Sequence, residues 1–200
     1  MKTTVLKAVV ASGIISFSTF SGAADLSGVP SGLYTVDPTH AYVTFSYNHL
    51  GMSDPVLSFD DFTVDLNLDN EDPTKSTVMV TIDANSIVAG SDKWKDHLVG
   101  DKFFDTANHP EITFTSTSVE AARDGNYKVM GDLTIKGESK PVALDVTINA
   151  AMNHPMSGDP VIGLQADSQL LRSEFGMTTA LPHVSDEIAL SVTAELGQSK

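Results

Sequence analysis

Histidine and carboxylate side chains are the first candidates for chemistry in this 200-residue sequence, which has six histidines and no cysteine. Without cysteine there are no disulfides, no thiolate catalysis and no cysteine-ligated metal. The histidines also lack the His-x-x-x-His spacing that places two imidazoles on one helix face. Three imidazoles could still converge in space, but hydrogen-bonded structural roles for His40 and His97 are the favoured interpretation. The sequence therefore predicts no metal site.

Hydrolases are the next class of protein to consider, and a hydrolase would need a nucleophile that a neighbouring base activates. No Gly-x-Ser-x-Gly turn occurs in the sequence, and no glycine-rich loop opens a helix that could hold phosphate. Asp37, Asp96 and Asp105 are candidate acid–base carboxylates, yet nothing in their spacing brings two of them together. We therefore predict no catalytic residues and no cofactor.

Arg172 is one of only two arginines and follows the apolar pair Leu170 and Leu171. It could hold the polar head of a ligand through charge-assisted hydrogen bonds. It could equally pair with a carboxylate that closes one end of the fold, and this structural role is favoured because a buried arginine needs a partner. Together with His40 and His97, Arg172 is a candidate for a polar rim.

Strands must position these residues, because apolar side chains recur at every second position in eight segments after Leu33. Each segment has one apolar and one mostly polar face, which is typical of antiparallel sheets with one side in water. Eight such strands can close into a barrel or stack as a sandwich. The segments are residues 41–48, 62–69, 77–84, 112–115, 127–136, 142–148, 162–170 and 188–196.

One long interruption, residues 86–108, breaks this alternation. Ser91 is a suitable helix N-cap, and Trp94 and Leu98 are spaced i, i+4 on one face. The pattern predicts a short helix at about residues 91–99, inserted between strands.

Charge and the N-terminus limit the partners and the location of the protein. The formal net charge of −14 argues against nucleic-acid binding and against a polybasic contact with anionic membrane surfaces. Residues 1–24 combine Lys2 and Lys7 with an uncharged, weakly apolar stretch and a small-residue cleavage site, which predicts a signal peptide. Residues 25–200 are predicted to form a single exported domain without a membrane-spanning segment.

Several segments, in order over about residues 33–196, together resemble the YceI-like family of periplasmic polyisoprenoid-binding proteins. The chain departs from the family pattern at residues 55–61 and 91–95. The segments that carry the resemblance are Tyr34-Thr35-Val36-Asp37-Pro38-Thr39-His40, Ile82-Asp83-Ala84-Asn85-Ser86, Asp96-His97-Leu98 with Phe103-Phe104-Asp105, Gly131-Asp132-Leu133-Thr134-Ile135 and Arg172-Ser173-Glu174-Phe175-Gly176-Met177.

The resemblance implies an all-β fold, an eight-stranded antiparallel lipocalin-like barrel, and a periplasmic location. It also implies non-enzymatic binding of an isoprenoid lipid, either a polyisoprenoid or an isoprenoid quinone, for storage, transport or a stress response. Two alternatives stay open: a periplasmic enzyme acting on a lipid-linked substrate in the same cavity, and an exported structural protein whose cavity is incidental. A homodimer is also left open.

The low aromatic content, 7%, suggests that medium-sized aliphatic side chains line a cavity rather than fill a solid centre. Strand parity predicts which strand residues point inward, and Ala166 shares the parity of the predicted wall. For Phe103, Phe175 and Met177 two roles stay open, cavity wall or ordinary core. The predicted cavity wall comprises Val43, Phe45, Phe62, Val64, Val80, Ile82, Phe103, Phe114, Leu133, Ile135, Leu144, Val146, Leu164, Leu170, Phe175, Met177 and Leu190.

Overall fold

The computed structural model describes residues 25–199, and the predicted signal peptide at residues 1–24 lies outside that range. The alternating segments form strands, and the predicted helix is present as α1 (Asp92–Val99), capped by the Ser91 side chain. Short 3₁₀ turns lie at Leu26–Gly28, Pro73–Lys75, Ala84–Ser86, Arg123–Gly125 and Arg172–Phe175. The strands are β1 (Gly32–His49), β2 (Val56–Phe59), β3 (Phe62–Leu68), β4 (Thr77–Asp83), β5 (Ile87–Val88), β6 (Glu111–Ala121), β7 (Tyr127–Ile135), β8 (Glu138–Asn153), β9 (Pro160–Leu171) and β10 (Val184–Gln198).

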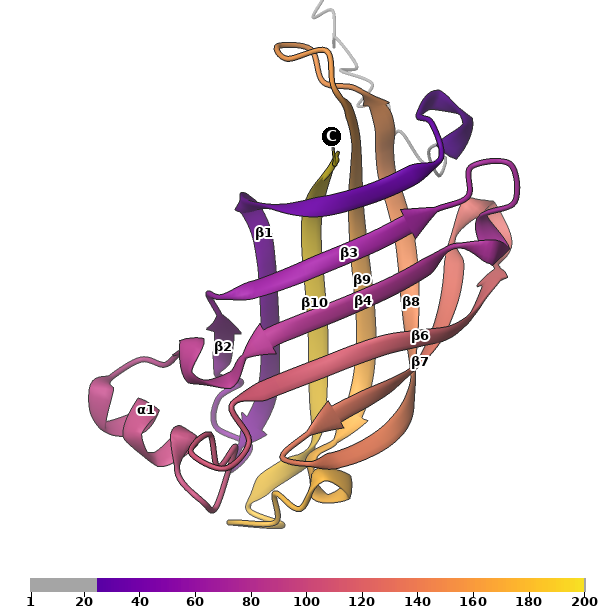
Figure 1. The fold of residues 1–200 in the computed structure, drawn as a ribbon. Coiled ribbons are helices and arrows are strands. Elements are labelled where there is room, and N and C mark those ends of the chain that lie inside the picture. Colours follow the sequence, from indigo (N-terminus) through magenta and orange to yellow (C-terminus); the bar gives the residue numbers. More distant parts are fainter. Residues whose placement is uncertain (1–24, 200) are drawn as a thin grey trace, which may run out of the picture.

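Eight of these strands close into an antiparallel barrel, as the sequence predicts (Figure 1). The pairing runs through β1, β3, β4, β6, β7, β8, β9 and β10, and β10 then pairs with β1. Closure leaves no free edge among these strands. Two short strands were not predicted: β2 adds to the second half of β1, and β5 adds to β2.

Strand β1 bends sharply, and Figure 1 shows its two halves running in different directions. Its first half pairs with β3 and its second half with β2, while its other edge follows β10 throughout. The bend falls between Val36 and Ala41, where four residues of β1 face only Glu195 of β10. This is a β-bulge, and Pro38, which cannot donate to a ladder, lies within it.

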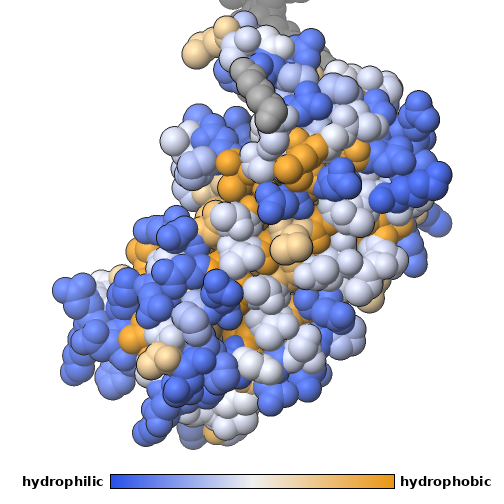
Figure 2. Space-filling model, viewed as in Figure 1, coloured by the Kyte–Doolittle hydropathy of each residue, from blue (hydrophilic) through white to orange (hydrophobic). Residues whose placement is uncertain are grey.

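The barrel interior is apolar at both ends. One buried cluster surrounds Tyr34, Ile162 and Leu196. The other cluster lies beneath α1, where Leu98 and Phe104 pack over the barrel opening. The outer face seen in Figure 2 is covered mainly by hydrophilic and intermediate side chains, with hydrophobic atoms visible between them. No helix in the described part of the chain combines the length and the apolarity needed to cross a membrane.

Candidate functional site

Two apolar cavities occupy the interior. The barrel cavity, about 160 Å³, lies within the eight strands. The helix-side cavity, about 760 Å³, lies between the barrel end, β2 and α1. The two cavities have four wall residues in common and so adjoin, and their combined size suits a small-molecule site. The shared residues are Val43, Ile82, Leu133 and Leu190.

Most of the predicted wall residues come from strands, whereas Phe103, Phe175 and Met177 lie in turns and loops outside them. All of the predicted wall residues except Phe62 line one or both cavities, and Ala166 lines the barrel cavity. Phe62, at the start of β3, instead packs against both buried clusters. The ligand-binding role of these side chains stays a prediction.

Sequence reasoning missed part of the helix-side wall. Leu57 and Phe59, both buried, come from the unpredicted strand β2. The Phe59 ring contacts the rings of Phe45 and Phe104, with centroids 5.7 and 5.6 Å away. The signal was present, because Leu57 and Phe59 alternate with Ser58, but four residues are too few for a periodicity argument.

Arg172 is buried, and its hydrogen-bond partners are backbone carbonyl oxygens instead of the carboxylate that we expected. Its guanidinium donates hydrogen bonds to the carbonyl oxygens of Met177, Ser185 and Val184, at 2.6, 2.8 and 3.0 Å. Burial lowers the pKa of Arg172, because removal from water disfavours the protonated, cationic form of the guanidinium. These bonds fasten the 3₁₀ turn at Arg172–Phe175 to the start of β10, and Arg172 also lines the helix-side cavity.

A few polar groups accompany Arg172 at the helix-side cavity. Tyr47 lies close to the Trp94 indole and to the Arg172 guanidinium, and burial raises the pKa of its hydroxyl. His97 lines the same cavity from α1, is exposed, and has its ring centroid 6.1 Å from that of Trp94. His97 and Arg172 therefore belong to one cavity.

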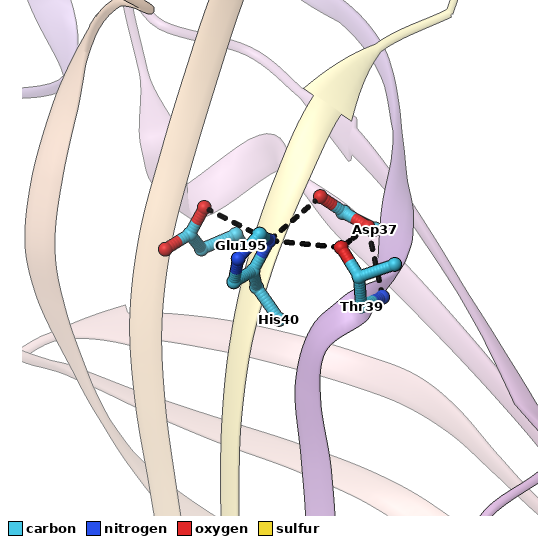
Figure 3. A network of polar contacts seen from close by, with 4 residues as sticks. All are labelled: Asp37, Thr39, His40 and Glu195. Atoms are coloured by element: carbon cyan, nitrogen blue, oxygen red, sulfur yellow. Dashed lines mark hydrogen bonds and ion pairs between the residues drawn. The ribbon is translucent and has the colours of Figure 1, made fainter.

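His40 does not line the helix-side cavity. The prediction that it shares a polar rim with His97 and Arg172 is therefore wrong for His40. It lies exposed on the bulge of β1, on the outside of the barrel (Figure 3). Its Nδ1 is 3.0 Å from Asp37 Oδ2 and 4.0 Å from Glu195 Oε2. The hydrogen bond to Asp37 and the charge of Glu195 raise the pKa of His40. The His40 imidazole, helped by Thr39, lowers the pKa of Asp37 to about 2.

The candidate acid–base carboxylates do not line the cavities. Asp37 is paired with His40 on the outer bulge. Asp105 accepts a hydrogen bond from the Asn108 side chain, and its Oδ2 is 4.0 Å from His109 Nε2. Asp96 is exposed on α1. Among residues 25–199, no aspartate or glutamate lines the barrel cavity or the helix-side cavity.

A closed eight-stranded antiparallel barrel around an apolar interior defines the class of this protein. The chain belongs to the YceI-like family, since the model of the YceI-like domain matches residues 34–196. It is 35% identical over 161 residues to a UPF0312 protein of Yersinia pestis (strain Pestoides F), covering 80% of this chain and 83% of the relative.

Solved structures with the same fold agree with this membership. The structure of BcnA from Burkholderia cenocepacia has a TM-score of 0.72 and 24% identity, covering 80% of this chain and 98% of BcnA. A Campylobacter jejuni YCEI protein has a TM-score of 0.68 and 28% identity, covering 76% of this chain and 90% of that one. A polyisoprenoid binding domain from Saccharophagus degradans has a TM-score of 0.65 and 13% identity, covering 85% and 100%.

Proposed function

We propose that this protein is a periplasmic, non-enzymatic carrier that holds the chain of an isoprenoid lipid, a polyisoprenoid or an isoprenoid quinone, in its two cavities. The observation that carries the proposal is the wall of the barrel cavity, which is almost entirely aliphatic and adjoins the helix-side cavity through four shared residues. The similarity in fold to a solved polyisoprenoid binding domain supports the same ligand class.

The energetics of such a wall suit a hydrocarbon chain. Covering each CH₂ group stabilises the complex by about 0.8 kcal/mol. Ten such groups contribute about 8 kcal/mol, which corresponds to a micromolar Kd before the cost of association is subtracted. A long isoprenoid exceeds this number of groups, so the wall alone accounts for tight binding without a charged anchor.

Binding is favoured over catalysis by the state of the polar groups. Arg172, the one buried charge among the described residues, already donates to three backbone carbonyls. Neither cavity wall presents a carboxylate that could act as a general base, among the residues described. An enzyme that acts on a lipid-linked substrate would therefore have to use an imidazole as its base, since His49 and His97 line the helix-side cavity.

The export part of the proposal rests on residues 1–24, whose two lysines, uncharged stretch and small-residue end match a cleavable signal. Delivery to the periplasm places the protein in an aqueous compartment, where a free isoprenoid would be insoluble. A carrier with an apolar interior removes that apolar surface from water.

Mass spectrometry of organic extracts tests the proposal directly. The protein is purified from its exported fraction without detergent, beside an unrelated exported protein of similar size. We expect an isoprenoid lipid in near-stoichiometric amount in the first extract and not in the second. Extracts without lipid, together with no uptake of an added isoprenoid quinone, would show that the cavities do not serve this ligand.

A further inference from the structure

The polar cluster on the outer bulge is separate from both cavities. Asp37 and His40 come from the bulge of β1, and Glu195 comes from β10 directly opposite (Figure 3). One ligand atom from each of these three side chains lies within 4.8 Å of the other two. Glu195 is the residue that faces all four bulge positions, so the backbone itself brings the three side chains together.

The spacing of these atoms is close to that of a tetrahedral metal site. Ligand atoms about 2.0–2.1 Å from Zn²⁺ at tetrahedral angles are about 3.4 Å apart. The His40 Nδ1 to Asp37 Oδ2 distance is 3.0 Å, and the Nδ1 to Glu195 Oε2 distance is 4.0 Å. These values bracket the required one, and the exposed Glu195 side chain is free to rotate by the small amount needed.

Hydrogen bonds from Thr39 orient the Asp37 carboxylate so that one of its oxygens, Oδ2, faces His40. The Thr39 backbone N–H and its hydroxyl both donate to Asp37 Oδ1, at 2.9 and 2.7 Å. Oδ2 is thereby left facing His40. Hydrogen-bonded support of a ligating carboxylate is the usual second layer of a metal site, because it fixes the orientation of the ligand.

We propose that Asp37, His40 and Glu195 bind one Zn²⁺ ion, with a water molecule as the fourth ligand. The ion replaces the proton on His40 Nδ1, so that its charge compensates the two carboxylates. Zn²⁺ accepts imidazole nitrogen and carboxylate oxygen together, whereas Ca²⁺ and Mg²⁺ prefer sites made of oxygen alone.

A metal ion here would join β1 to β10 across the pairing that closes the barrel. Because it would bind the folded barrel and not the unfolded chain, Zn²⁺ should raise the melting temperature. This effect is independent of any lipid, because none of the three ligands lines a cavity.

Calorimetric titration of the tag-free protein with ZnCl₂ tests the site. Co²⁺, followed by the intensity of its visible absorption, reports whether the bound ion is tetrahedral. The variants are His40→Asn and Glu195→Gln. The matched controls are His183→Asn, an exposed histidine elsewhere, and Glu187→Gln, an exposed carboxylate on the same strand.

We expect one equivalent of Zn²⁺ to bind the parent protein and both controls with the same affinity. His40→Asn and Glu195→Gln should each weaken binding by at least about tenfold, since even loss of indirect ligand support costs that much. The proposal is overturned if Zn²⁺ does not bind, or if these two variants bind it as the parent does. It is also overturned if Ca²⁺ binds with the same affinity as Zn²⁺ and the His40→Asn variant binds both ions as tightly as the parent does.

Discussion

Val43 is the position where the cavity-wall hypothesis is most sharply tested. Its side chain is 2% exposed and lines both cavities. Its cross-strand neighbours, Phe59 and Val192, are both apolar. Leu133 is also shared by the two cavities, but it lies opposite Lys140, which could neutralise an introduced carboxylate.

Val43→Thr replaces one methyl group with a hydroxyl of the same shape. In the empty cavity the hydroxyl can meet water, but an isoprenoid chain would remove that water and leave the hydroxyl unpaired. The cost of about 1–3 kcal/mol corresponds to a loss of affinity of about 5- to 150-fold. Tyr42→Thr is the matched control, because Tyr42 is the adjacent residue and is 60% exposed.

Val43→Asp adds a pH dependence whose sign follows from burial. The lipid removes water from the carboxyl group, so the pKa of the group is higher in the complex than in the free protein. Affinity should therefore be greatest at low pH and fall as the pH rises from the pKa in the free protein to the raised pKa in the complex.

Displacement of a fluorescent isoprenoid analogue measures both variants, and circular dichroism checks their folding. Val43→Thr keeps the test decisive if Val43→Asp does not fold. If folded Val43→Thr binds the analogue as tightly as the parent, the isoprenoid does not occupy these cavities.

Further predictions concern other parts of the chain. His97→Ala should keep isoprenoid affinity within about tenfold, because His97 is exposed, and complete loss of binding would instead indicate a polar site. Arg172→Met should lower the free energy of unfolding by at least about 3 kcal/mol, measured by urea denaturation, since three carbonyl groups lose their donors. Gly131→Val should cost about 1–3 kcal/mol in the same assay, because a side chain there would overlap the Phe114 ring, and an unchanged midpoint would contradict that packing. N-terminal sequencing of the exported protein should find a start near residue 24 or 25, whereas an intact Met1 would argue against a cleaved signal.

Local signals were enough to predict the barrel strands and the helix. Each barrel strand has an apolar residue at every second position over several residues, and this pattern requires only that one face be buried. Ser91 and the i, i+4 pair of Trp94 and Leu98 likewise identify α1, because a cap and a buried face are properties of consecutive residues.

Contacts between distant segments were not predictable in this way. The partners of Arg172 are carbonyl oxygens, which every residue carries and no sequence pattern distinguishes. Strand β2 pairs with the second half of β1, along the edge that β3 occupies only in the first half, so its place depends on where β1 and β3 separate. Phe62 has the inward parity of its strand, but its side chain packs against both buried clusters and lines neither cavity.

The bulge in β1 explains how one strand serves both the cavities and the outer cluster. Before it, Tyr34 and Val36 face the interior, and after it Ala41 and Val43 do, so the inward positions change from even to odd. The opposite strand keeps its parity, with Leu196 paired to Val36 and Ala194 paired to Ala41. Five steps along β1 thus match two along β10, and the extra residues can only project outward. This shift of phase, centred on a proline, is the sequence signal that could have placed His40 outside the barrel.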